Sequence, residues 1–340
     1  MTTTSAIGAH VELATRPSPA AVGQRTKPRK LWRSASITPQ QVNRLRFTDL
    51  PRVWMRGFDF HAISEQRCTK LIARESMRGN GGRVVTPNLH ILRLCCRDPE
   101  VADLVKQADL RAADGMPLVW ASWLQRTPLP ERIAGSSLIW SLSELAAKRG
   151  LSVYFLGGNE GTAERAAQQL TKTYPDLQVA GHYCPPFGFD SDPEERMKMY
   201  QAVIDAEPDI VYVALGCPKQ ERVMESLYRR MPEAWYLGVG YSFSFVAGES
   251  ARAPQWMQRS GMEWLHRLSS EPRRLFKRYL VECLPFFGHM ALRSVIKGLL
   301  PMRCRRRTES SYLQSRFVRS SELQSRNRVD SESMMSGGPA

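Results

Sequence analysis

The chain has 340 residues, enough for a large buried core in one or two domains. Its 48 Lys and Arg against 33 Asp and Glu give a net charge of +15, which indicates an anionic partner: nucleic acid, a membrane surface or a phosphorylated substrate. Residues 1–30 lack the apolar stretch of a signal peptide, and no run of about 18 apolar residues predicts a transmembrane helix. The seven cysteines have no Cys-x-x-Cys spacing, which favours reduced thiols in the cytosol over disulfides or a zinc site.

Both ends of the chain differ in composition from its middle. Residues 1–50 are poor in apolar residues and rich in Ser, Thr, Pro and Arg, and residues 303–340 are rich in Arg, Ser and Glu. Such segments bury too little apolar surface to fold, so we expect a disordered extension at each end. Between them we expect an α/β core over residues 51–250 and a helical appendage over residues 251–302.

Strands and helices alternate through the predicted core. The expected strands are 83–85, 151–156, 177–180, 210–215 and 235–240, and the expected helices are 89–108, 136–150, 162–174, 193–206 and 219–230. Ile210–Leu215 is apolar throughout, as in a strand that is buried on both faces of a parallel sheet. The alternation predicts a Rossmann-like, mostly parallel sheet flanked by helices.

Polar residues follow two of these strands, at the sheet edge where ligands of open α/β folds bind. Lys219, Gln220 and Glu221 come after one strand, and Thr86 and Asn88 come after another. Solvated turn residues, or helix caps in the case of Thr86 and Asn88, explain the pattern equally well.

Gly157 and Gly158 open the segment between a strand and a helix. Glycines let the backbone approach a phosphate, and the helix N-terminus offers N–H groups to it. The spacing is neither the dinucleotide fingerprint nor a Walker loop, so a tight structural turn is an equal alternative.

Asp114 stands before Gly115, with Pro117 close behind. This pattern predicts an exposed turn that fixes the direction of the carboxylate, which can then take a proton from an attacking hydroxyl. An Asp-Gly turn or a helix cap is the structural alternative.

Two other chemical readings are less favoured. Asp190-Ser-Asp192 is similar to the Asp-x-Asp signature of metal-dependent sugar transfer, but Asp192 before Pro193 and two glutamates is typical of a helix start. The histidines have no ligand spacing, so we assign no metal. A Gly-x-Ser-x-Gly motif is lacking, so a hydrolase of that kind is unsupported.

Most of the net charge lies in residues 251–307, which hold thirteen Lys or Arg and three Glu and so contribute +10 of the total of +15. Trp, Phe and Leu are interleaved with them, a composition that suits a membrane interface with anionic lipids. A helical cap on the core with a solvated basic face is the alternative. Nucleic acid is disfavoured, because the aliphatic content suits acyl chains better than phosphate tracking.

Several sequence blocks stand in a fixed order. They are TPN (86–88), ADGMPLV (113–119), RIAGSSL (132–138), VYFLGGNEG (153–161), YP (174–175), ALGCPKQE (214–221), GVGYSFSFVAG (238–248) and RAPQWMQRSGMEWLHRLSSEPRRLFKRY (252–279). Over about residues 50–285 the set resembles the WecG/TagA/CpsF family of bacterial glycosyltransferases, glycosyltransferase family 26. The resemblance implies transfer of a sugar from a UDP-sugar to a polyprenyl-diphosphate-linked acceptor, with inversion and without a metal.

The resemblance also implies roles for residues. Asp114 matches the proposed general base. Other matched residues lie around the donor sugar and its diphosphate, or are expected to stabilise the diphosphate: Thr86, Asn88, Arg132, Gly157, Gly158 and Gln220. The basic C-terminal appendage is expected to touch the membrane and to help close the site, through Arg267, Arg273, Arg274 and Arg278.

Ser244 departs from the family pattern, which usually has Asp at that position to contact the nucleotide base. A hydroxyl can hydrogen-bond there but cannot act as a carboxylate, so uracil selectivity and the donor are left open.

The leading interpretation is an inverting, metal-independent glycosyltransferase without cofactor that acts in exopolysaccharide or other envelope-glycan assembly. It would be cytoplasmic and peripheral on the inner face of the membrane, with no nucleic-acid partner. A homo-oligomer is left open. The alternative is a non-catalytic, membrane-surface nucleotide-sugar-binding protein, motivated by Ser244.

Overall fold

The computed structural model describes residue 47 and residues 49–300, so most of the two segments expected to be disordered lie outside the described residues. Phe47 and Leu50, assigned above to the N-terminal extension, are part of the buried core. The ring of Phe47 packs against Trp235, with the ring centroids 6.1 Å apart. The described core therefore includes residues before the expected boundary at 51.

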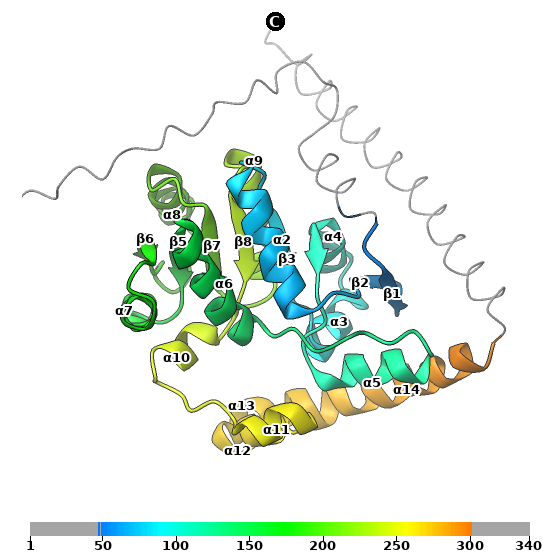
Figure 1. Cartoon of the computed structure of the whole chain (residues 1–340). Coiled ribbons are helices and arrows are strands. Elements are labelled where there is room, and N and C mark those ends of the chain that lie inside the picture. The colour runs from blue at the N-terminus through cyan, green and yellow to red at the C-terminus, as the bar shows by residue number, and fades with distance from the viewer. Residues whose placement is uncertain (1–46, 48, 301–340) are drawn as a thin grey trace, which may run out of the picture. The chain divides into compact units, whose positions relative to one another are not determined.

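Six strands form one parallel sheet in the order β4-β3-β8-β7-β5-β6 (Figure 1). They are β3 (Gly82–Val85), β4 (Leu110–Arg111), β5 (Ser152–Gly157), β6 (Gln178–Tyr183), β7 (Ile210–Ala214) and β8 (Trp235–Gly238). Helices cover both faces. The predicted fold class, a Rossmann-like parallel sheet flanked by helices, is confirmed.

The helices of the α/β core are α2 (Glu65–Met77), α3 (Leu89–Cys95), α4 (Pro99–Gln107), α5 (Met116–Leu124), α6 (Gly135–Arg149), α7 (Thr162–Thr173), α8 (Pro193–Asp205) and α9 (Lys219–Arg230). Successive side chains of β7 point to opposite faces of the sheet. Val211 and Val213 pack with α4, α8 and α9, whereas Ile210 and Tyr212 pack with α2, α6 and α7. This explains why the strand is apolar at every position.

The single helix expected over 89–108 is wrong, because the structure has two. Helix α3 ends at Cys95, and Asp98 then caps α4 by accepting hydrogen bonds from the N–H groups of Glu100 and Val101. Pro99 takes the first helical position, where a missing N–H costs nothing. A proline in the middle of one continuous helix would have removed a hydrogen bond.

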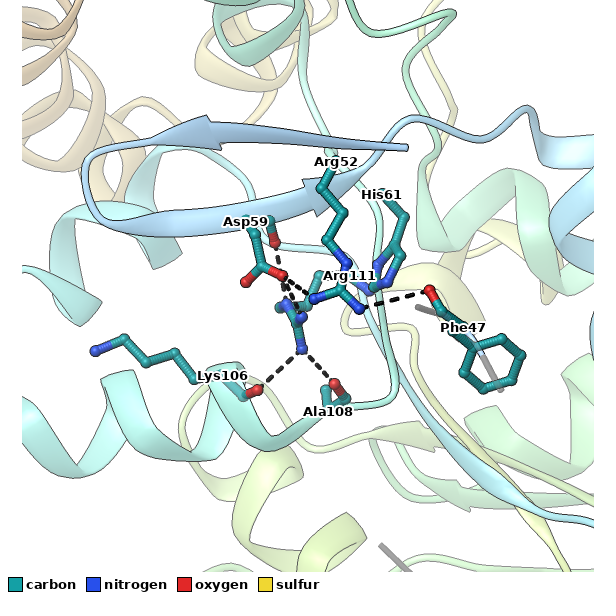
Figure 2. A network of polar contacts seen from close by, with 7 residues as sticks. All are labelled: Phe47, Arg52, Asp59, His61, Lys106, Ala108 and Arg111. Atoms are coloured by element: carbon teal, nitrogen blue, oxygen red, sulfur yellow. Dashed lines mark hydrogen bonds and ion pairs between the residues drawn. The ribbon is translucent and has the colours of Figure 1, made fainter. Parts of the chain in front are cut away.

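A hairpin of β1 (Arg52–Met55) and β2 (Phe58–His61) lies beside the short edge strand β4 and is joined to it by a buried polar network (Figure 2). Asp59 pairs with both Arg52 and Arg111, at 2.7 Å each. The backbone N–H of Arg111 donates to Nδ1 of His61 at 3.0 Å. The Arg111 guanidinium also donates to the carbonyl oxygens of Lys106 and Ala108. The network fixes β4 three residues before Asp114.

The charges in this network set two protonation states. Burial would raise the pKa of Asp59, but Arg111 and Arg52 outweigh it and lower this pKa to about 2. Burial lowers the pKa of His61 to about 3, and the two guanidinium groups add to this effect. At neutral pH the network therefore holds an ionised aspartate and a neutral histidine.

The C-terminal part is helical: α10 (Ser242–Val246), α11 (Gln255–Ser260), α12 (Glu263–Ser270), α13 (Pro272–Phe276), the π-helical segment η2 (Lys277–Cys283) and α14 (Leu284–Leu299). Helix α14 runs beside α5 (Figure 1). Two glycines let the C-terminal part approach α5. A Cβ on Gly261, between α11 and α12, would lie 2.7 Å from the Met116 side chain, and one on Gly298 of α14 would overlap the carbonyl oxygen of Leu124. Among the described helices, none has the length and apolar character needed to cross a membrane.

Candidate functional site

The loops that follow the parallel strands meet at one edge of the sheet. The N–H of Asp114, after β4, donates to the carbonyl of Pro87, after β3, at 3.0 Å. The N–H of Gly158, after β5, donates to the carbonyl of Ala214, at the end of β7, at 2.9 Å. The predicted site residues of the core come from this edge or from the helices that start there, as expected for ligand sites in open α/β sheets.

Asp114 is half-buried and lies directly before α5, so the expected exposed turn is wrong. Helices of the C-terminal part bring further charged groups to it. Burial raises the pKa of Asp114 to about 6, and the nearby Glu263 carboxylate adds to the rise. Arg132, Arg267 and Arg252 act in the opposite direction. A carboxylate in this position is ionised at neutral pH and more basic than an ordinary aspartate, as a general base requires.

Arg132 and Glu263 form a largely buried ion pair next to Asp114. Arg252 lies 3.8 Å from the same glutamate and donates to the Ser137 hydroxyl at 2.9 Å. Arg132 was predicted from the sequence, whereas Arg252 and Glu263 were not. Both stood in the quoted block 252–279, and nothing in their local spacing marked them as neighbours of Asp114.

Gly157 and Gly158 adopt φ values of 99° and 85°, which side chains rarely tolerate. A Cβ on Gly157 would lie 2.6 Å from the Ala214 carbonyl oxygen, and one on Gly158 would press on Phe243 at 3.3 Å. The glycines are thus needed for the turn itself. The structural alternative holds, and a ligand role for their backbone stays a prediction.

Ser244 is buried in α10, and its side chain hydrogen-bonds to the Glu249 carboxylate. Glu249 also accepts a hydrogen bond from the Thr162 hydroxyl at 2.7 Å and pairs with Arg165. Burial would raise the pKa of Glu249, but these partners lower it. A carboxylate therefore lies beside Ser244, although it belongs to Glu249 and not to residue 244. Glu249 was not predicted, because it stands just outside the sequence block 238–248.

Asn88 caps α3, because its side-chain oxygen accepts from the N–H groups of His90 and Ile91 at 3.1 Å each. This is the capping alternative stated above. Gln220 is buried at the start of α9 and donates to Glu221 at 2.8 Å, while its amide oxygen has no hydrogen-bond partner among the described residues. Thr86 is half-buried at the end of β3. A contact of these three side chains with a donor sugar stays a prediction.

The four predicted arginines of the C-terminal part divide into two groups. Arg267 lies over the rings of Tyr241 and Phe245, 5.8 Å from each centroid, and contributes to the field at Asp114. Arg278 is half-buried near His90, and its Nε has no hydrogen-bond partner among the described residues.

The other two arginines are exposed. Arg274 pairs with Glu271 at 2.6 Å and lies over Tyr241. The Arg273 side chain makes no ion pair or hydrogen bond with the described part of the chain. Arg267 thus contributes to the field at Asp114, Arg278 lies near His90 of α3, and Arg273 is exposed.

The Asp190–Asp192 pair has structural roles. Asp192 caps α8 by accepting from the N–H groups of Glu194 and Glu195, which confirms the predicted helix start. Asp190 accepts a hydrogen bond from Lys219 at 2.7 Å. Within the described residues there is no group of three or more His, Cys, Asp or Glu that could hold a metal ion. Metal independence stays a prediction.

A family model described as the glycosyl transferase WecG/TagA/CpsF family matches residues 53–298. This chain belongs to the WecG/TagA/CpsF family. The resemblance inferred from the ordered motifs is therefore confirmed, and with it the prediction that the protein is a glycosyltransferase.

Two curated relatives carry the name N-acetylglucosaminyldiphosphoundecaprenol N-acetyl-beta-D-mannosaminyltransferase. The one from Bacillus subtilis strain 168 is 30% identical over 200 residues, which cover 59% of this chain and 75% of the relative. The one from Bacillus spizizenii is 29% identical over 197 residues, which cover 58% of this chain and 74% of the relative.

Proposed function

We propose that this glycosyltransferase moves an N-acetylhexosamine or a hexose from a UDP-sugar to a polyprenyl-diphosphate-linked saccharide, with inversion, during assembly of an envelope glycan. The observation that carries the proposal is Asp114, a carboxylate with a pKa of about 6 at the ligand-binding edge of the sheet, beside Arg132. The names of the two relatives support the lipid-linked acceptor.

In the proposed reaction Asp114 accepts the proton of an acceptor hydroxyl while that oxygen bonds to the anomeric carbon of the donor sugar. The bond from that carbon to the diphosphate oxygen breaks on the opposite face, and UDP leaves with the bonding electrons. Arginines then stabilise the charge that develops on the diphosphate. Arg132 and Arg267 are the candidates for this role, because both already contribute to the field at Asp114.

The test is transfer by the purified full-length protein from UDP-N-acetylmannosamine, UDP-glucose and UDP-glucuronic acid to a polyprenyl-diphosphate-linked N-acetylglucosamine. Asp114→Asn should lower turnover by about 10²–10⁴-fold, the usual contribution of a general base. Asp103→Asn is the matched control, because Asp103 is an exposed carboxylate of α4. Turnover of Asp114→Asn within about threefold of wild type contradicts the role. Tight UDP binding with no transfer favours the alternative, a nucleotide-sugar-binding protein.

We further propose that the C-terminal helices hold the enzyme at the inner face of the cytoplasmic membrane. The exposed apolar side chains of this part include Trp256, Trp264 and Phe276, and Arg273 and Arg274 are exposed beside them. Amphipathic basic helices of this composition bind anionic interfaces.

Replacing both Arg273 and Arg274 with Glu should lower partition onto phosphatidylglycerol vesicles by about thirtyfold or more, since each Arg near such a surface contributes about 1 kcal/mol. The matched control is Arg149→Glu with Lys172→Glu, two exposed cations on α6 and α7. Unchanged co-sedimentation of the Arg273 and Arg274 variant removes the membrane proposal.

A further inference from the structure

A pocket of about 270 Å³ lies where the C-terminal end of α3 meets the turn between β1 and β2 and the junction of η2 with α14. Its lining residues are Arg56, Arg93, Cys96, Arg97, Val281, Glu282, Pro285 and Phe286. Asn88 starts α3 and Arg97 follows its end, so the pocket lies roughly 13 Å along the helix from the candidate active site. The pocket is therefore separate from Asp114 and its neighbours.

The pocket has an excess of positive charge. Glu282 is its single carboxylate and pairs with Arg93 at 3.0 Å. Arg97 is exposed, and its guanidinium has no ion pair with the described residues. Arg56 lies over the Phe286 ring at 5.4 Å, and its buried Nε has no hydrogen-bond partner there. The carbonyl end of a helix contributes about half a negative charge, which leaves the three arginines only partly compensated.

The rim of the pocket is apolar. Val281 is 58% exposed, and the neighbouring Leu284 is 57% exposed. Pro285 and Phe286 complete this side. The pocket thus combines cationic groups with exposed apolar groups, the two kinds of contact that an amphiphile needs. The volume lies just below the usual range of about 300–1,000 Å³ for small-molecule pockets, so it suits a head group better than a whole nucleotide sugar.

We propose that this pocket binds the phosphate of an anionic phospholipid head group, with the acyl chains running over Val281 and Leu284. Guanidinium groups recognise phosphate oxygens through paired, charge-assisted hydrogen bonds. The lipid thereby fixes the orientation of the C-terminal helices on the membrane. The proposal rests on the proposed membrane association but not on the identity of the sugar.

Cys96 reports on the pocket, because its exposed thiol lies in the lining. The full-length protein is alkylated with iodoacetamide, and the rate at Cys96 is followed by peptide mass spectrometry, with Cys184 as the internal reference. Vesicles of phosphatidylcholine with phosphatidylglycerol, at a lipid concentration that binds all the protein, should slow the Cys96 reaction by about tenfold or more, since charge-assisted hydrogen bonds contribute about 1.5–3 kcal/mol each. Pure phosphatidylcholine vesicles and inorganic phosphate should not.

Arg56→Gly with Arg97→Ala is the test variant. Arg56 has a positive φ of 52°, so a glycine there removes the guanidinium and also relieves the backbone strain at this position. Arg126→Gly is the matched control, because Arg126 is an exposed arginine with a φ of 57° outside the pocket. Protection of Cys96 should be lost in the test variant and kept in the control.

Four results would overturn the lipid site, its ligand or the membrane proposal. Equal protection in wild type and in the test variant, with both on the vesicles, shows that Cys96 is shielded by membrane contact alone and overturns the site. Equal protection by inorganic phosphate and by vesicles overturns the lipid as ligand. A protein that binds no vesicles refutes the membrane proposal, whereas vesicle binding without Cys96 protection refutes only this pocket.

Discussion

The protonation of Asp114 should respond in opposite directions to two neighbouring substitutions. Arg132→Gln removes a cation that lowers the pKa, and Glu263→Gln removes an anion that raises it. An opposite charge within about 4–6 Å shifts a carboxyl pKa by about 1–3 units. From a value of about 6 in the wild type, we expect the pKa to reach about 7 or more in Arg132→Gln and to fall by about a unit in Glu263→Gln.

Two assays measure this shift. The ¹³C carboxyl resonance of Asp114 in protein labelled at aspartate reports the pKa without substrate. The acidic limb of kcat/KM against pH reports the same ionisation in the free enzyme once a donor and an acceptor are known. If both variants shift the pKa in the same direction, or neither shifts it by half a unit, the electrostatic account of Asp114 is wrong.

The raised pKa of Asp114 also makes the stability of the fold depend on pH. Folding raises the pKa of Asp114 from 3.8 to about 6, so the folded state favours the protonated carboxyl. The stabilisation that this protonation gives the folded state is lost as the pH rises through about 6. Asp114→Asn should therefore be more stable than wild type at pH 8, with little difference at pH 3. Urea unfolding at the two pH values measures this.

Two further changes probe the frame around the site. Asp59→Asn should lower the free energy of unfolding by about 3–5 kcal/mol in urea, because it leaves the buried Arg111 without its carboxylate. The effect should shrink as the pH falls through about 2, the pKa at which Asp59 is itself half protonated, and a loss below about 1 kcal/mol at pH 7 contradicts the network. Gly298→Ala should loosen the contact of α14 with α5, because the new methyl group overlaps the Leu124 carbonyl. We expect faster amide hydrogen exchange confined to α14. Unchanged exchange would contradict the packing.

The strands that are buried on both faces could be predicted, because an apolar run identifies such a strand without information about the helices that pack against it. Ile210–Ala214 is such a run. Helix α2 was missed because few of its residues are strongly apolar and its buried positions include Thr69 and Glu75. Helix α5 was missed because Gly115 and Pro117 read as a turn, although a proline at the start of a helix is favourable.

The candidate site could be predicted only where a residue follows a strand or belongs to a recognised motif. Asp114 and Arg132 met that condition. Glu263, Arg252 and Glu249 reach the site from segments far along the chain, and their roles arise from the packing of α12 and of the segment after α10. Spacing within one segment carries no information about such contacts.

The place of β8 in the sheet has a consequence for the order in which the molecule can form. Among the described residues β8 is the last strand in sequence order, yet it lies between β3 and β7 and is hydrogen-bonded to both. Strands β5, β6 and β7 can pair as soon as they leave the ribosome, and so can β3 and β4, but these two groups of strands can join only after β8 has been made. Pairings between such distant segments are slow to form. During synthesis the β3–β4 pair, which precedes Asp114, therefore stays separate from the rest of the sheet until β8 is made, and a nascent chain stalled before Trp235 should expose its open edge to proteases and chaperones.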